Sequence, residues 1–143
     1  MILRPLVEWL SSARRLRPGS FVAAELPWCG RRIDYATYSQ SGITSAYELK
    51  LAKHKVAIEQ ALYNRSSFAR SYIVTDRRPS DDNMRLAAEL GVGVLLATLE
   101  GIRILSPSPM RLPSGAVHRR LVHKITTKGV AYEHVWSKVL SLP

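Results

Sequence analysis

The chain has few acidic residues, a single cysteine and no long apolar runs, and each of these shortages excludes some classes of protein. Among 143 residues, 21 Lys and Arg outnumber 11 Asp and Glu, which gives a formal charge of +10. Cys29 is the single cysteine, so disulfides cannot hold the fold together and a reducing cytoplasm fits best. No apolar run approaches the roughly 20 residues of a membrane span, and no secretory signal follows Met1. We therefore expect a cytoplasmic domain that does not bind membranes.

The positive charge is concentrated towards the two ends of the sequence. Near the start, Glu8 stands against four arginines, and after Pro107 Glu133 stands against six Lys or Arg residues: Arg111, Arg119, Arg120, Lys124, Lys128 and Lys138. A chain this basic attracts polyanions, because its summed field favours them over neutral partners. We expect nucleic acid as the partner. Solubility or an acidic protein partner are the alternatives.

The spacing of apolar residues changes along the chain and predicts an α/β fold. We expect helices at 2–16, 53–64 and 82–90, and strands at 20–26, 31–38, 44–51, 71–75, 92–98 and 102–105. The first three strands follow one another through short turns, which is typical of an antiparallel meander. Later strands alternate with helices, which implies parallel pairing. The prediction is a mixed β-sheet flanked by helices.

A proline-rich break at Ser106-Pro-Ser-Pro suggests a boundary. We expect residues 1–106 to form the core domain and residues 107–143 to form a basic extension outside it. Within this extension, 117–125 and 132–142 have helical patterns. The extension is expected to bind nucleic acid or a partner, although its apolar residues also require a surface to pack against.

Three polar residues interrupt the apolar pattern of neighbouring strands. Glu48 and Lys50 are two residues apart, so they point to the same side of a strand. Asp34 points away from the side expected to hold Ile33, Tyr35 and Thr37, and pairing through the 39–42 turn can bring Asp34 and Glu48 together. Paired carboxylates bind hard cations such as Mg²⁺, and a nearby lysine can orient water or stabilise developing charge. An ordinary solvated strand surface is the simpler alternative.

These residues make the chain resemble the PD-(D/E)XK nuclease superfamily, whose fold is called restriction-endonuclease-like. The resemblance covers about residues 1–105 and is carried by Arg32-Ile-Asp-Tyr-Ala, Ala46-Tyr-Glu-Leu-Lys-Leu, a helix containing Gln60, and Ser71-Tyr-Ile-Val. Ile33 occupies the place of the proline that often precedes the aspartate in the family. The resemblance implies a helix, three strands, a helix and a strand, in that order.

The resemblance also implies roles for individual residues. Asp34 and Glu48 would bind Mg²⁺, with Mn²⁺ as an alternative, and Lys50 would assist water attack or stabilise the transition state. Gln60 would contribute from the next helix, where Tyr63 shares its side. A further metal ligand is expected at Glu25, with Glu8 as the rival: Glu25 ends the first strand, whereas Glu8 lies on the first helix.

The implied activity is hydrolysis of phosphodiester bonds by a metal-dependent endonuclease or exonuclease, with DNA as the expected substrate. Lys53, Lys55, Arg65 and Arg70 are expected to hold the nucleic-acid backbone near the site. The main alternative is a nuclease-like module without activity that binds nucleic acid or assembles into a larger complex. A homodimer is also compatible with the sequence, and RNA remains an alternative substrate.

Overall fold

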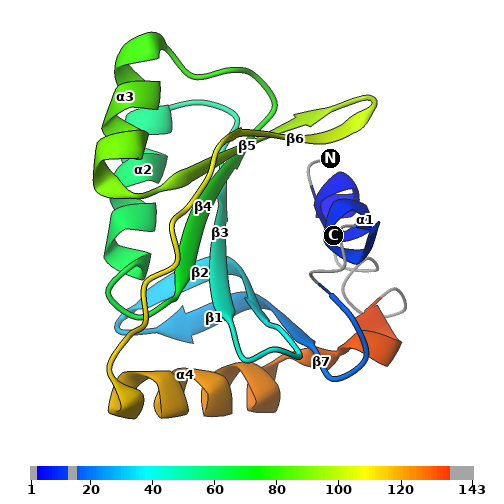
Figure 1. The fold of residues 1–143 in the computed structure, drawn as a ribbon. Helices are drawn as coiled ribbons and strands as arrows, with labels where there is room; N and C mark the ends of the chain where they lie inside the picture. The colour runs from blue at the N-terminus through cyan, green and yellow to red at the C-terminus, as the bar shows by residue number, and fades with distance from the viewer. Residues whose placement is uncertain (1–2, 13–15, 136–143) are drawn as a thin grey trace.

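The structure is a computed structural model that describes residues 3–12 and 16–135 (Figure 1). Within them, four α-helices surround one mixed sheet with the strand order β6-β5-β4-β3-β2-β1-β7. The strands are β1 (Phe21–Trp28), β2 (Arg31–Tyr38), β3 (Thr44–Leu49), β4 (Arg70–Thr75), β5 (Gly93–Thr98), β6 (Gly101–Ser106) and β7 (Val130–Ala131). The helices are α1 (Leu3–Ser12), α2 (His54–Asn64), α3 (Asp81–Leu90) and α4 (Gly115–Lys128).

The meander of β1, β2 and β3 is antiparallel, as the sequence predicts. The first turn is tighter than expected, because Pro27 still belongs to β1 and only two residues connect the strands. Cys29 and Gly30 both have positive φ, at 50° and 74°. Two such residues in succession give the twist that a two-residue hairpin requires.

The parallel part of the sheet also agrees with the sequence pattern. β3 pairs in parallel with β4, and β4 pairs in parallel with β5, so α2 and α3 are the crossover helices. Ser80 caps α3 by accepting a hydrogen bond from the Asn83 backbone, and Gly91 ends the helix in the left-handed conformation. β6 then returns antiparallel along β5. These connections bring together the start of β2, the end of β3 and the end of α2.

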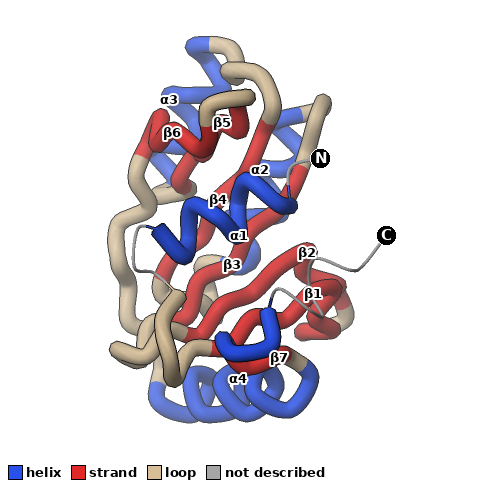
Figure 2. Tube along the Cα trace, turned by 90° about the vertical axis from the view of Figure 1, so that its right-hand side faces the viewer, coloured by secondary structure: helices blue, strands red, loops and turns tan. Residues whose placement is uncertain are grey.

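The helices lie on both faces of the sheet. Figure 2 shows α1 across the face turned to the viewer, where Leu6, Val7 and Leu10 pack with Tyr47 and Tyr72. The two tyrosine rings stack at 5.2 Å between centroids. On the other face, α2 and α3 cover β4 and β5 through a cluster of Ala57, Ile58, Ala61, Ile73, Ala87, Val92 and Val94. The predicted mixed sheet flanked by helices is therefore confirmed.

The predicted separation of residues 107–143 from the core is wrong for the residues that the structure describes. Leu121 and Ile125 of α4 are fully buried against residues of β1, β2 and β3. The short strand β7 then pairs with β1. The proline-rich segment after β6 therefore connects two parts of one domain. It leads to α4, which covers apolar side chains of β1, β2 and β3. Most of the predicted helix 132–142 lies outside the described part, which ends at residue 135; its described start forms a 3₁₀ turn over Tyr132–His134.

The alternation of side chains along β2 also departs from the prediction at one residue. Ile33 does not pack with Tyr35 but joins the cluster of Leu121, together with its register partner Leu26. Between Ala24 and Leu26, Glu25 has φ of 51°, which lies in the left-handed region that a residue with a side chain rarely adopts. This kink changes which side chains of β1 and β2 face α4. None of the described helices is both long and apolar enough to cross a membrane.

Candidate active site

The candidate site lies where β2 and β3 separate. Their pairing runs from Tyr38 opposite Thr44 to Tyr35 opposite Tyr47 and then stops. At the next position, the Oδ2 atom of Asp34 accepts a hydrogen bond from the Leu49 backbone N–H at 2.8 Å. A side chain thus takes the place of the next backbone bond, so the strands can diverge without leaving that N–H unpaired. Asp34 is fixed at the divergence by this bond.

Glu48 is buried beside Asp34, with 2% of its surface exposed. One of its oxygens accepts a hydrogen bond from the Asn64 side chain at 3.0 Å. Burial raises the pKa of Glu48 from 4.5 to about 7, and the nearby Asp34 carboxylate adds to the rise. The hydrogen bond from Asn64 and the charge of Arg31 oppose the rise. Close to neutral pH, the pair of carboxyl groups therefore carries less than two full negative charges.

Arg31 and Asn64 belong to this site, although neither is among the residues that the sequence predicts for it. The Arg31 guanidinium donates to Asn64 Oδ1 at 3.2 Å and lies 5.2 Å from the ring centroid of Tyr63. It also reaches the Gln60 carbonyl at 3.4 Å. Asn64 follows Gln60 by one helical turn, and that spacing is the sequence signal that could have identified it. Arg31 has no comparable signal, because its contacts depend on how β2 approaches α2.

Gln60 and Lys50 have positions compatible with their predicted roles. The Oε1 atom of Gln60 is buried and has no hydrogen-bond partner among the described residues. Lys50 follows β3 directly, and its backbone N–H donates to the Val74 carbonyl at 3.0 Å, which extends the pairing with β4. Strand alternation then places the Lys50 side chain on the side of Glu48. Lys50 makes no ion pair with a carboxylate in the described part of the chain.

The structure does not bring the two candidates for a further metal ligand into this pair. Glu25 lies on β1, next to the strand that carries Asp34. Its side chain is 69% exposed, and its Oε1 atom lies 4.0 Å from the Arg32 guanidinium. Glu8 lies on α1, on the opposite face of the sheet, and is exposed. No group of three or more Asp, Glu, His or Cys side chains that could hold a metal ion occurs within residues 3–12 and 16–135.

Two of the four predicted backbone-binding residues lie away from the site. The Arg65 guanidinium donates to the carbonyls of Gly91 and Pro109, at 2.6 and 3.1 Å, so it fastens the crossing after β6 to α2. Burial lowers the pKa of Arg65. Arg70 lines a pocket with Tyr47, on the face of the sheet away from Glu48. The sequence prediction placed both too close to the site, because the sequence does not reveal which side of α2 and β4 they occupy.

Lys53 and Lys55 are exposed at the start of α2, where the backbone of Lys53 is left-handed with φ of 55°. They remain predicted contacts.

The donor set fits a hard divalent cation that keeps several water ligands. Mg²⁺ is commonly held by one or two carboxylates, with water filling the remaining positions. Asp34 and Glu48 provide two such groups, whose mutual repulsion a cation would relieve. Such a cation would supply charge to polarise a phosphodiester and lower the pKa of a bound water.

Comparison with protein-family models and with curated proteins gives no significant match. Among solved structures, the chain is similar to SPO1766, described as a protein of unknown function from Silicibacter pomeroyi. The TM-score is 0.64 and the identity 20%, over 88% of this chain and 82% of that one. This likeness extends to the fold alone.

Two other solved structures share less of the architecture. A repair endonuclease from Pyrococcus abyssi has a TM-score of 0.48 and 16% identity, over 62% of this chain and 43% of that one. SfsA of Pyrococcus furiosus, in complex with Ca²⁺, has a TM-score of 0.42 and 16% identity, over 76% and 61%.

Proposed function

We propose that the chain is a metal-dependent nuclease of the PD-(D/E)XK type that hydrolyses phosphodiester bonds, with DNA as the expected substrate. The observation that carries the proposal is the juxtaposition of Glu48 and Asp34 at the strand divergence. Burying one carboxyl group beside another lowers the stability of the fold, and such arrangements are concentrated at functional sites. Binding of Mg²⁺ or Mn²⁺ is such a use.

The side chains around the pair have separable tasks in this proposal. Asn64 orients the Glu48 carboxylate, and the Leu49 backbone orients that of Asp34. Lys50, on the same side, is the residue to orient or deprotonate the attacking water, or to stabilise the charge that develops on phosphorus oxygens. Arg31, at the start of β2, donates a hydrogen bond to Asn64 of α2 and so helps to hold Asn64 beside Glu48.

Nucleic acid would approach over a positively charged surface. Lys53 and Lys55 are exposed at the start of α2, and the exposed Arg119 and Arg120 project from α4. The net charge of +10 favours association with any phosphate backbone. These contacts position the backbone and carry no sequence specificity of their own.

The test is a cleavage panel of duplex, single-stranded and branched DNA and of RNA, each with Mg²⁺, Mn²⁺ or a chelator. We expect cleavage that requires the metal and falls roughly 100-fold or more in Asp34→Asn, since a ligand to the catalytic cation is removed. Glu59→Gln is the matched control, because Glu59 is exposed on α2 and outside the site. Metal-independent cleavage, or equal rates in Asp34→Asn and the control, would refute the proposal. Absence of cleavage with retained nucleic-acid binding would favour the inactive binding module.

A further inference from the structure

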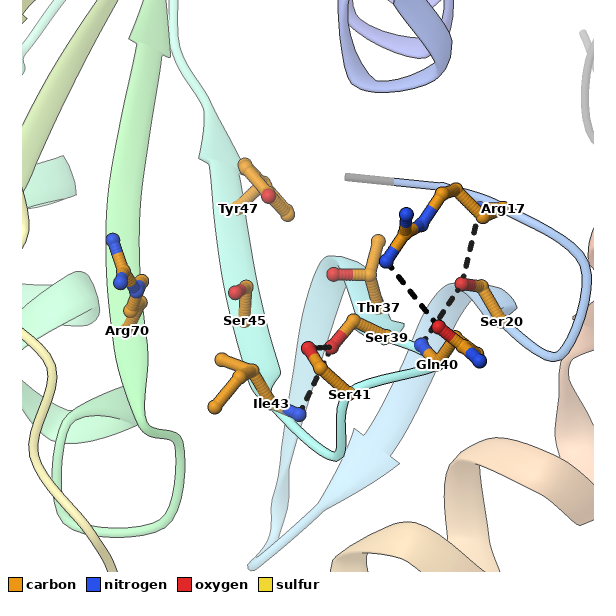
Figure 3. Close-up of a pocket in the computed structure, with 10 residues that line it drawn as sticks. All are labelled: Arg17, Ser20, Thr37, Ser39, Gln40, Ser41, Ile43, Ser45, Tyr47 and Arg70. Atoms are coloured by element: carbon orange, nitrogen blue, oxygen red, sulfur yellow. Dashed lines mark hydrogen bonds between the residues drawn. The ribbon is translucent and has the colours of Figure 1, made fainter. Parts of the chain in front are cut away.

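A polar pocket of about 220 Å³ opens on the α1 side of the sheet, beside the turn between β2 and β3 (Figure 3). Among the residues that the structure describes, its lining holds Arg17 and Arg70, four serines and Thr37, but no carboxylate. In a protein, arginines are ordinarily balanced by acidic neighbours when they share a concave site. Here no described acidic residue balances the two arginines, so an anionic ligand would do so.

The floor of the pocket is a row of side chains across three strands. Thr37 of β2 is the register partner of Ser45 in β3, and Ser45 is the register partner of Arg70 in β4. Partners on adjacent strands point to the same side, so two hydroxyls and a guanidinium are aligned. Thr37 and Ser45 are 4% and 7% exposed. Neither hydroxyl, nor the Arg70 guanidinium, forms a hydrogen bond with any residue the structure describes.

The opposite wall is held rigidly by hydrogen bonds. The Ser20 hydroxyl accepts from the backbone N–H groups of Arg17 and Gln40, at 3.2 and 3.1 Å. The Arg17 guanidinium donates to the Gln40 side chain at 3.3 Å. In the turn, the hydroxyls of Ser39 and Ser41 lie 2.9 Å apart. Figure 3 shows Arg17 and Arg70 on opposite sides of the hydroxyls, so the two positive charges flank the cavity.

We propose that this pocket is a binding site for a phosphate group, separate from the carboxylate pair. Guanidinium groups bind phosphate oxygens through paired, charge-assisted hydrogen bonds, and hydroxyls can donate to the remaining oxygens. The volume leaves room for part of the molecule that bears the phosphate. Thr37 and Ser45 face the α1 side, whereas Glu48 faces α2, so one phosphate cannot occupy both sites. The proposal does not depend on nuclease activity.

An NMR titration of the ¹⁵N-labelled full chain with inorganic phosphate, at constant ionic strength, tests the site. We expect saturable shifts in the amides of Gln40, Ser41 and Ser45, with those of Glu48 and Asn64 unchanged. Arg70→Gln should weaken phosphate binding about tenfold, the effect expected for removing one charge-assisted hydrogen bond. Arg103→Gln is the control, because Arg103 is exposed on β6 and outside the pocket.

Arg17→Gln and Ser45→Ala keep the test decisive if Arg70→Gln does not fold. Equal weakening in the Arg103→Gln control, or shifts scattered over α4 instead of the pocket, would overturn the proposal. So would the absence of saturation. Parallel titrations with a 5′-mononucleotide, and with one oligonucleotide carrying either a 5′-phosphate or a 5′-hydroxyl, distinguish a small phosphate compound from a nucleic-acid end. Binding in either arm supports the site.

Discussion

The two faces of the sheet carry side chains of opposite charge. On the α2 side, Asp34 and Glu48 lie together at the divergence of β2 and β3, and burial raises the pKa of Glu48. On the α1 side, Arg17 and Arg70 flank a pocket whose described lining contains hydroxyls and no carboxylate. The alternation of side chains along a strand makes this separation possible within a few residues. One face is therefore suited to cations and the other to anions.

The largest expected effect is on catalysis. Glu48→Ala should abolish cleavage, with a loss of about 100-fold or more, because it removes a metal ligand. Binding of DNA in chelator, measured by fluorescence anisotropy, should stay within a few-fold, since the surface arginines and lysines are unchanged. Phosphate titration of the α1-side pocket should also be unaffected. Loss of DNA binding together with cleavage, absent in Glu59→Ala, would indicate a structural role for Glu48.

The attachment of α4 to the sheet gives the next largest effect. Leu121 is fully buried among residues of β1, β2 and β3, so Leu121→Ala should lower the free energy of unfolding by about 2–5 kcal/mol. Urea denaturation measures this change. Ala116→Gly, at an exposed position in the first turn of α4, controls for helix propensity, with an expected cost below about 1 kcal/mol, the value for a helix interior. A cost for Leu121→Ala no larger than that of the control would show that α4 is not an integral part of the domain.

The buried carboxyl group predicts a pH-dependent stability. In the unfolded chain Glu48 loses its proton near pH 4.5, whereas in the folded chain it does so near pH 7. The folded state therefore binds more protons between these values, and stability should fall as pH rises from 4.5 to 7. The full shift corresponds to roughly 3 kcal/mol.

Glu48→Gln tests this cost directly. Its carbonyl oxygen can accept from Asn64, and its NH₂ group can donate to Asp34, as a protonated glutamate would. Without metal, the variant should therefore be more stable than the native chain at pH 8 and similar at pH 4.5. Thermal unfolding of both proteins across this range, with Glu59→Gln as control, provides the comparison. A native chain whose stability stays constant from pH 4.5 to 7 would contradict the buried position of Glu48.

The smallest expected effect concerns the positive charge of α4. Neutralising Arg119 and Arg120 to glutamine should weaken DNA binding and reduce the salt dependence of log K by about 0.9 for each phosphate that the helix ceases to neutralise. Circular dichroism checks that the helix persists, because Arg120 also lies 5.8 Å from the ring centroid of Trp28. An unchanged salt dependence would remove α4 from the nucleic-acid surface.

The element order and the approach of Asp34 to Glu48 are predictable from the sequence, because both depend on local spacing and on short turns. Arg31 cannot be predicted as a site residue, because its contacts depend on how β2 packs against α2. The spacing of residues along the sequence does not reveal that packing. The sequence prediction places Arg70 near the site, whereas it lies on the face away from Glu48. The face to which a β4 side chain points depends on the pairing register with β3, which the sequence does not reveal. The proline-rich segment resembles a domain boundary, because the sequence does not show that α4 packs back onto the sheet.

Titration of the ¹⁵N-labelled chain with Mn²⁺ tests the central claim most directly, because this paramagnetic ion broadens the signals of nearby amides. The account predicts that the amides of Asp34, Glu48 and Leu49 broaden first, while those of Ser39 and Ser41 stay sharp. The effect should disappear in Glu48→Gln and persist in Glu59→Gln. Broadening that begins elsewhere, or that persists unchanged in Glu48→Gln, would contradict a metal site at the carboxylate pair.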